Sequence, residues 1–315
     1  MSTNDAGAAS ALETLRRPMD RRQFMRRAAV VGIGAAVMPG FLAACAAEAT
    51  ATPTPTATST PTATPTPAPS PTPVPSAAGG ANPLFVVGSG VTRNDIAIPS
   101  GGDQIAAYMA RPAGDAPAPG VVVIHENRGL VPYVRDVVDG LASSGFVAVA
   151  PDLLSREGGT AQVDSASGAL RAAPAGQHDA DALAVVDYLK SRSDVGRIGI
   201  IGFCFGGAIV WRVSTQSADI AAAVPFYGTN PPLDAVPSIS AAVYAVYGAD
   251  DNRVNAGIED ITAALNAAGT TWDSKVYAGS PHAFMNHTRE DRYNTETAPQ
   301  AWVDALAWLD RHLRA

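Results

Sequence analysis

A cysteine between two glycines is the residue in this chain best suited to chemistry. Cys204 lies in the segment Gly202-Phe203-Cys204-Phe205-Gly206, between an apolar run and a stretch with helical composition. This spacing predicts a strained strand-to-helix turn that lifts a nucleophile out of a sheet, because glycines two residues away on either side avoid steric clashes. A helix N-terminus favours thiolate over thiol, so we expect the turn to lower the pKa of Cys204.

A cysteine nucleophile needs a base, and the base needs an orienting group. Asp251 and His282 each follow a different predicted strand, and the chain order of nucleophile, acid and histidine is the one found in α/β-hydrolases. Spacing alone does not separate Asp251 from its neighbour Asp250, one of which could cap the following helix, and His287 competes with His282. The sequence predicts a Cys-His-Asp triad assembled at one edge of a sheet.

A third loop, residues 125–130, follows the apolar run at 121–124 and reads His-Glu-Asn-Arg-Gly-Leu. It lacks the second histidine of an H-E-x-x-H zinc motif, because Gly129 stands there. In α/β-hydrolases this loop and the residue after the nucleophile supply backbone N–H groups to an oxyanion. We therefore expect the amides of Asn127 and Phe205 to form the oxyanion hole.

The elements that must position these loops alternate along residues 81–315. Apolar periodicity at i, i+3, i+4 and i+7 predicts helices around residues 134–141, 182–189 and 302–309, with a weaker one at 258–265. Continuous apolar runs predict buried parallel strands, and two earlier segments predict a leading hairpin. The expected fold is a single α/β-hydrolase domain, a doubly wound, mostly parallel sheet with helices on both faces; its strands are expected at 121–124, 146–150, 198–203, 221–226, 242–247 and 274–277, with the hairpin at 95–98 and 104–110.

The motifs around Cys204, Glu126, Asp251 and His282, taken in order, resemble the dienelactone hydrolase (carboxymethylenebutenolidase) family over about residues 92–314. The resemblance selects Asp251 over Asp250 and implies that Glu126 contacts the thiol and helps it to become a thiolate.

Two features depart from the family pattern. Members of the family bind a substrate carboxylate with arginines, one of them four residues after the histidine, where this chain has Asn286. Arg128 is the substitute that we expect to bind substrate, with Arg171 and Arg253 as alternatives. The second departure is an export signal, which does not fit a cytosolic catabolic enzyme.

That signal occupies residues 1–45. Paired arginines, Arg21-Arg22, precede an apolar run at 28–44 that is too short and too interrupted by Gly and Pro for a typical membrane span. The run ends in a lipobox-like Leu-Ala-Ala before Cys45, which predicts twin-arginine export and lipidation of Cys45; ordinary cleavage is the alternative. Residues 46–80, rich in Thr and Pro, predict a disordered linker, so the chain is expected to be a membrane-tethered lipoprotein outside the cytoplasmic membrane.

Composition limits the partners. The chain of 315 residues carries 22 basic and 29 acidic residues, a net charge of -7, which disfavours nucleic acid. Two cysteines lack structural-zinc spacing, and the expected chemistry requires no metal or cofactor. The sequence therefore predicts an exported hydrolase of small esters or lactones. Alternatives are an inactive ligand-binding or scaffold lipoprotein of the same fold, or a hydrolase of thioesters, peptides or polyester fragments.

Overall fold

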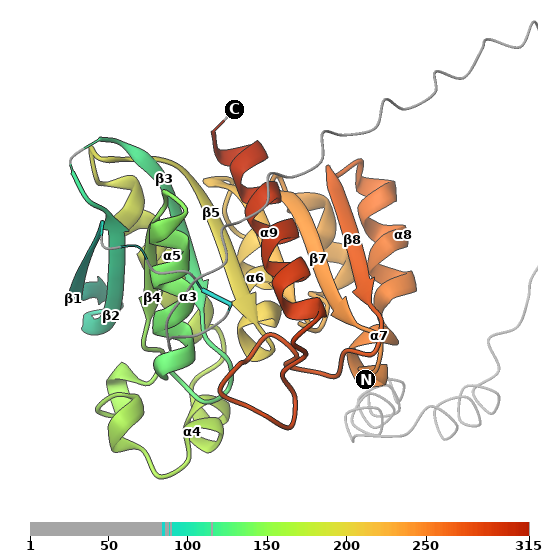
Figure 1. Cartoon of the computed structure of the whole chain (residues 1–315), viewed down its shortest axis with the longest axis horizontal. Coiled ribbons are helices and arrows are strands. Elements are labelled where there is room, and N and C mark those ends of the chain that lie inside the picture. The colour runs from blue at the N-terminus through green and yellow to red at the C-terminus, as the bar shows by residue number, and fades with distance from the viewer. Residues whose placement is uncertain (1–83, 86–87, 89, 115, 315) are drawn as a thin grey trace, which may run out of the picture. The chain divides into compact units, whose positions relative to one another are not determined.

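The computed structural model describes residues 84–85, 88, 90–114 and 116–314, so the predicted signal, Cys45 and the linker lie outside the described residues. The described chain forms one eight-stranded sheet in the order β1-β2-β4-β3-β5-β6-β7-β8 (Figure 1). The strands are β1 (Val91–Ser100), β2 (Asp103–Pro112), β3 (Ala118–Ile124), β4 (Val147–Pro151), β5 (Val195–Phe203), β6 (Ile220–Phe226), β7 (Ala242–Gly248) and β8 (Trp272–Tyr277).

The first two strands form the predicted hairpin. β1 and β2 pair antiparallel from Val91 opposite Pro112 to Ser100 opposite Asp103, and β2 joins the sheet antiparallel to β4. All the remaining pairs, from β4 through β8, are parallel. The carboxyl ends of the parallel strands therefore meet at one edge, which is where ligands bind in such sheets.

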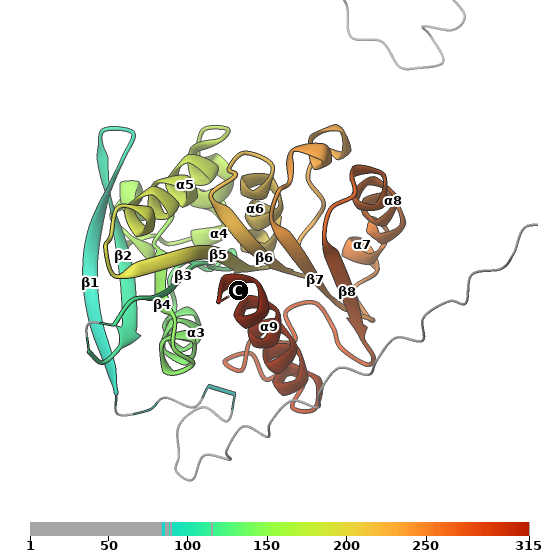
Figure 2. The same cartoon turned by 90° about the horizontal axis from the view of Figure 1, so that it is seen from above.

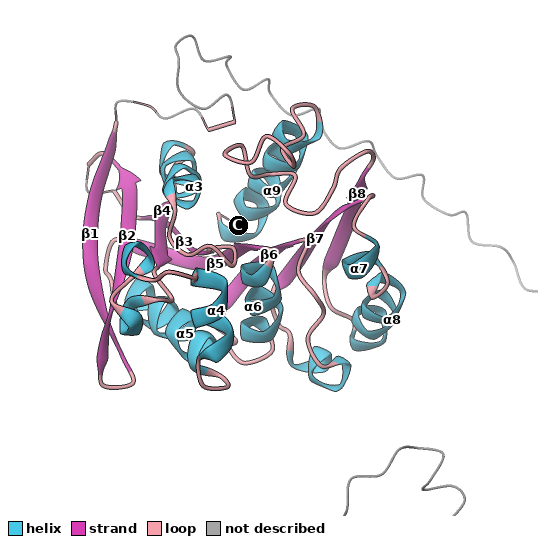
Figure 3. Ribbon diagram, turned by 90° about the horizontal axis from the view of Figure 1, so that it is seen from below, coloured by secondary structure: helices cyan, strands magenta, loops and turns pink. Residues whose placement is uncertain are grey.

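Helices cover both faces of this sheet. In Figures 2 and 3, α3 and α9 lie on one face, and α4, α5, α6 and α8 lie on the other. The helices are α3 (Pro132–Ser143), α4 (Ala166–Ala172), α5 (Gln177–Lys190), α6 (Phe205–Ser214), α7 (Asn252–Asn255), α8 (Ile258–Ala268) and α9 (Thr297–Leu313), with short 3-10 turns η1 (Ser155–Glu157), η2 (Thr160–Gln162) and η3 (Leu233–Ser238). The predicted doubly wound α/β architecture is confirmed.

The burial of the helices follows the periodicity of the sequence. Val134, Val137, Val138 and Leu141 of α3 are all fully buried, and they pack with α9 in one core on their face of the sheet. The apolar stripe of α5 packs in a second core with α6 and α8 on the opposite face. Burying both faces removes the strands from water, which explains why they read as continuous apolar runs.

None of the helices in the described ranges is long and apolar enough to cross a membrane.

Candidate active site

The turn between β5 and α6 places Cys204 at the first turn of a helix. Cys204 is the residue before α6 and has a φ of 56° and a ψ of -112°, a conformation that is strained for a residue with a side chain. A Cβ at Gly202 would lie 2.5 Å from the carbonyl oxygen of Gly206, and a Cβ at Gly206 would lie 2.3 Å from that of Ile124. Only glycine fits at these two positions, so the spacing read from the sequence has a direct steric cause.

Backbone strain among the described residues concentrates at this site. Cys204, Tyr227 and Ala283 are the non-glycine residues there with positive φ, at 56°, 37° and 68°. Tyr227 follows β6, and Ala283 follows the predicted base His282. Such conformations persist only where the surrounding structure over-determines them, and they cluster at functional sites.

The sulfur of Cys204 faces the two amides predicted to form the oxyanion hole. The backbone N–H groups of Phe205 and Asn127 hydrogen-bond to the thiol and lower its pKa, as does the positive charge of Arg253. Burial and the negative charge of Glu126 outweigh these effects and raise the pKa of Cys204 to about 11. The expectation of a lowered pKa is therefore wrong for this conformation, because burial and a neighbouring carboxylate act more strongly than the helix N-terminus.

Asp251 holds the imidazole of His282. The distance from His282 Nδ1 to Asp251 Oδ2 is 2.5 Å, and Asp251 is buried, whereas Asp250 is exposed. Asp251 also caps α7 by accepting a hydrogen bond from the backbone N–H of Val254. The partner of His282 and the helix cap, expected to be two different residues of the Asp250-Asp251 pair, are therefore both Asp251. His287 instead faces Asp136 of α3, with 3.2 Å between His287 Nε2 and Asp136 Oδ2.

His282 and Cys204 share a neighbour, Tyr227. The ring centroids of Tyr227 and His282 are 5.1 Å apart, and the charges of Cys204 and Glu126 both act on the Tyr227 hydroxyl. Within the described ranges no hydrogen bond joins His282 to the thiol, which instead accepts hydrogen bonds from the two amides. The structure thus brings Glu126, Cys204 and His282 next to Tyr227, with the thiol hydrogen-bonded to the Phe205 and Asn127 amides.

Glu126 is buried, with a relative exposure of 3%, and its charge acts on the Cys204 thiol. Its Oε2 accepts from the Asn286 side chain at 2.7 Å, and its Oε1 accepts from the Tyr227 hydroxyl at 3.4 Å. Burial raises the pKa of Glu126, and these two donors, with Arg289 and Arg128, lower it. A buried carboxyl with a raised pKa beside a thiol is suited to receive a proton.

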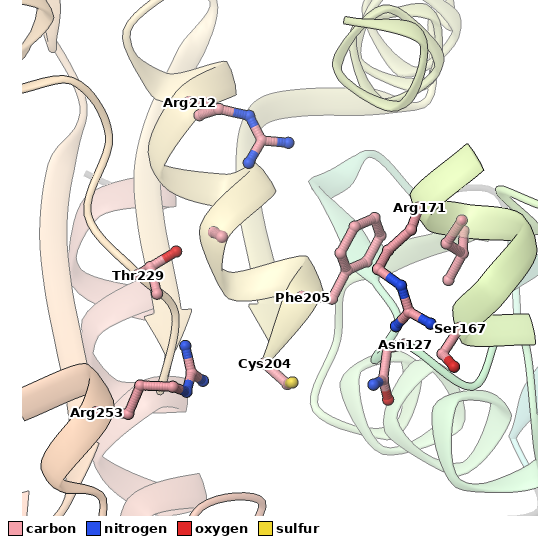
Figure 4. Close-up of a pocket in the computed structure, with 10 residues that line it drawn as sticks. Asn127, Ser167, Arg171, Cys204, Phe205, Arg212, Thr229 and Arg253 are labelled. Carbon is pink, nitrogen blue, oxygen red and sulfur yellow. The ribbon is translucent and has the colours of Figure 1, made fainter. Parts of the chain in front are cut away.

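A pocket of about 350 Å³ opens at the thiol (Figure 4). Arg171 of α4 and Arg253 of α7 approach it from opposite sides, and neither forms an ion pair or a hydrogen bond with the described residues. Arg212 also lines the pocket, but it is bound by Asp179 at 2.6 Å. The lining residues are Asn127, Ser167, Leu170, Arg171, Cys204, Phe205, Ala208, Arg212, Thr229 and Arg253.

The structure does not bring Arg128 into this pocket. Its side chain is exposed, and it acts on the site only through its charge on Glu126. The physical reason is that the loop turns immediately after Asn127: Gly129 has a φ of 82° and packs against Thr160, which leaves Arg128 on the outer surface. Arg171 and Arg253, the other two arginines considered, are the ones that line the pocket.

Tyr227 and the interaction of Asn286 with Glu126 are the features that sequence reasoning missed. Tyr227 follows the carboxyl end of β6, so the rule that located the other loops could have singled it out. Asn286 was noted only as a departure from a family pattern. No group of three or more His, Cys, Asp or Glu side chains that could hold a metal occurs in the part of the chain that the structure describes.

The eight-stranded sheet, the strained turn and the acid-histidine pair define the α/β-hydrolase class. The family model for the dienelactone hydrolase family matches residues 105–313, and the chain belongs to that family. As a member of this family, the chain is a dienelactone hydrolase-like hydrolase, and its small-molecule substrates are esters or lactones.

Relatives support this assignment over most of their length. The Escherichia coli (strain K12) protein named "Putative carboxymethylenebutenolidase" is 32% identical over 232 residues, which cover 68% of this chain and 85% of that protein. The protein of the same name from Salmonella typhimurium is 32% identical, covering 73% and 90% of the two chains.

Solved structures agree with this fold. The crystal structure of the "Putative Dienelactone Hydrolase" from Klebsiella pneumoniae has a TM-score of 0.65 and 31% identity, and it covers 70% of this chain and 99% of that chain. A dienelactone hydrolase from Anabaena variabilis, at 20% identity and a TM-score of 0.57, shares the fold, covering 71% and 100% of the two chains.

Proposed function

We propose that this hydrolase uses Cys204 as its nucleophile, with Glu126, His282 and Asp251 moving or directing protons. The observation that carries the proposal is the strained turn that holds the Cys204 sulfur against the Phe205 and Asn127 amides. We expect those amides to stabilise a developing oxyanion, and each donor of this kind typically contributes about 2.7–4 kcal/mol to a transition state.

In the acylation half of the proposed reaction, the thiol proton passes to the Glu126 carboxylate. The thiolate leaves the two amides and attacks the substrate carbonyl, whose oxygen takes its place on them. The ester C–O bond breaks, and His282, protonated and paired with Asp251, gives its proton to the leaving oxygen.

In the deacylation half, neutral His282 takes a proton from a water molecule that attacks the thioester carbon. The C–S bond breaks, the acid leaves, and the sulfur recovers its proton from Glu126. Every group returns to its starting protonation state, and the net reaction consumes one ester or lactone bond and one water molecule.

Hydrolysis of an activated aryl ester tests this assignment. We expect Cys204→Ala or alkylation of the thiol to abolish turnover, with circular dichroism confirming that the variant is folded. Full activity after both treatments would overturn the choice of nucleophile, and a panel of thioesters, peptides and polyester fragments tests the alternative substrates.

Arg171 and Arg253 favour a substrate with a negative charge close to the scissile bond. Both line the pocket without an ion-pair partner among the described residues, whereas the Asp179 carboxylate already binds Arg212. An unneutralised guanidinium pair binds a carboxylate strongly, since charge-assisted hydrogen bonds are about twice as strong as neutral ones.

Replacing these arginines distinguishes charged from neutral substrates. We expect Arg171→Gln and Arg253→Gln each to raise KM for a carboxylate-bearing lactone at least about tenfold, a cost of ~1.4 kcal/mol, with little change for the uncharged analogue. Arg128→Gln serves as the matched control and is expected to leave the KM ratio of the two substrates unchanged. Equal losses with both substrates would contradict anion recognition.

The remaining part of the proposal concerns location. The Arg21-Arg22 pair, the apolar run and the lipobox-like sequence before Cys45 support export by the twin-arginine route and attachment to the membrane through a lipid. We expect Cys45→Ser to move the protein from the membrane fraction to the soluble fraction, and Arg21→Lys with Arg22→Lys to block export. An unchanged distribution in both variants would contradict this localisation.

A further inference from the structure

Asn286 is a buried amide in direct contact with Glu126. It lies four residues after His282, between β8 and α9, and its relative exposure is 1%. Its Nδ2 donates to Glu126 Oε2 at 2.7 Å, while the Tyr227 hydroxyl donates to the other oxygen at 3.4 Å. Both carboxyl oxygens of Glu126 therefore act as acceptors, which is the pattern of a carboxylate.

Thr288 fixes which end of the Asn286 amide meets Glu126. Asn286 Oδ1 accepts from Thr288 Oγ1 at 2.7 Å and from the Thr288 backbone N–H at 3.1 Å. A flipped amide would lose both bonds and would turn its oxygen towards a carboxylate. The Thr288 contacts therefore ensure that Asn286 presents N–H groups to Glu126.

The titratable and charged groups that surround Glu126 come from several different elements. The Cys204 thiol lies at the start of α6, and the hydroxyls of Tyr227 and Tyr133 come from the end of β6 and from α3. Arg289 and Arg128 act only through charge, and the Arg289 guanidinium is already bound to Asp291 at 2.8 Å. Of the two side-chain hydrogen bonds to the carboxylate, the one from Asn286 is the shorter, and its donor is neutral.

Because Asn286 is a neutral donor, its effect on Glu126 differs from the effect of a cation at the same place. It stabilises the ionised form of Glu126 by hydrogen bonding, yet it leaves the negative charge uncompensated. That charge raises the pKa of the Cys204 thiol. One amide can therefore keep Glu126 ready to accept a proton and the resting thiol protonated.

We propose that Asn286, oriented by Thr288, is the positioning residue that keeps Glu126 ionised and able to receive the thiol proton. The inference rests on the proposed function, because it assigns Asn286 the control of a proton acceptor that the mechanism uses. It concerns a buried hydrogen bond rather than contact with the substrate.

Asn286→Leu in the full chain tests the proposal with two readouts, the acidic limb of the kcat/KM profile and the midpoint of the thiol titration. Removal of the donor raises the pKa of Glu126, so the acidic limb of the kcat/KM profile shifts upward by about one pH unit. At the alkaline pH where the thiol titrates, Glu126 is ionised with or without the Asn286 donor, so the midpoint of the thiol titration is expected to stay where it is in the unmodified protein. Thiolate absorbance, measured as the difference from the matching Cys204→Ala protein, reports this midpoint without a contribution from Cys45.

Two further variants separate positioning from general damage. Thr288→Val removes one of the two bonds that orient the amide and is expected to shift the acidic limb in the same direction by a smaller amount. Asn294→Leu removes side-chain bonds to Gly279, Glu296 and Thr297 in the same segment, away from Glu126. This control is expected to leave both midpoints where they are in the unmodified protein.

An unchanged acidic limb in a folded Asn286→Leu protein would overturn the inference, and so would an equal shift in Asn294→Leu. The proposed function fails separately, if Cys204→Ala retains full turnover. A dead Cys204→Ala protein together with an unshifted Asn286→Leu protein would refute the role of Asn286 alone.

Discussion

At the scale of single residues, the surroundings of Cys204, the proposed nucleophile, disfavour its thiolate form. Burial and the Glu126 carboxylate raise the pKa of Cys204 to about 11, in spite of the two amides and Arg253. A thiol with a raised pKa is protonated at neutral pH and is a poor nucleophile. We therefore expect the resting thiol to react slowly with alkylating reagents.

Alkylation kinetics test this expectation. In the full chain carrying Cys45→Ser, we expect the rate of reaction of Cys204 with iodoacetamide to rise about tenfold per pH unit up to about pH 11. Glu126→Gln removes the repelling charge and is expected to move the midpoint to lower pH. A midpoint near pH 8.5 in the parent protein would contradict this expectation.

The pairing of His282 with Asp251 gives a second prediction at this scale. Asp251→Asn removes the charge 2.5 Å from His282 Nδ1, so we expect kcat to fall on the order of 10²–10⁴-fold. Asp250→Asn changes the exposed neighbour and is expected to keep kcat within about twofold. Comparable losses in the two proteins would show that the short contact does not matter for turnover.

At the scale of elements, the loop after β3 is held in place by residues of the segment that follows β4. Leu130 N donates to Thr160 Oγ1 at 2.8 Å, and Thr160 Oγ1 donates to the buried Asp152 at 2.7 Å. Gly129, at a φ of 82°, lies so close to Thr160 that a Cβ would come within 2.1 Å of its Oγ1. The Asn127 amide therefore depends on the segment after β4 for its position.

Gly129→Ala tests this dependence. The added methyl group displaces the loop and is expected to lower kcat at least about tenfold, together with a loss of ~1–3 kcal/mol in the free energy of unfolding. Gly102→Ala is the matched control, because Gly102 has a φ of 91° and open space around its Cβ position. It should lose stability but keep kcat; a Gly129→Ala protein with normal kcat would contradict the proposed support of Asn127.

The sequence predicted an element correctly where a local pattern of residues alone determines the local structure. The apolar runs located every parallel strand, and Gly202 and Gly206 identified the turn because only glycine fits there. Spacing along the chain could not distinguish Asp250 from Asp251 or place Arg128, since each depends on how a loop turns in space. The contact of Asn286 with Glu126 spans 160 residues and left no local pattern.

At the scale of the whole molecule, both faces of the sheet are buried, and residues with strained backbone follow the carboxyl ends of its strands. The pKa of Glu126 is raised in the folded protein, so the carboxyl binds its proton more tightly there than in the unfolded chain. Its ionisation therefore destabilises the fold: stability is greatest below the unfolded pKa and declines as the pH rises through the folded pKa. The site retains this carboxylate at a cost to the fold.

Glu126→Gln is expected to remove this destabilisation of the folded state. At pH 8 the variant should be more stable on the order of 1 kcal/mol, which corresponds to a rise in Tm of about 2–4 °C for a domain of this size, and its activity should be lost. Thermal unfolding at pH 4 and pH 8 measures the effect, with the gain largest at pH 8. A lower Tm for the variant at pH 8 would contradict the destabilising role of Glu126.

The most direct measurement of the central claim is the covalent intermediate itself. When the full chain is mixed with a slowly deacylating activated ester and quenched in acid, we predict an acyl group in thioester linkage on the peptide containing Cys204. Its amount should rise to about one equivalent at the rate of the product burst. Steady turnover without any acylated Cys204, or with the acyl group on another residue, would contradict the account.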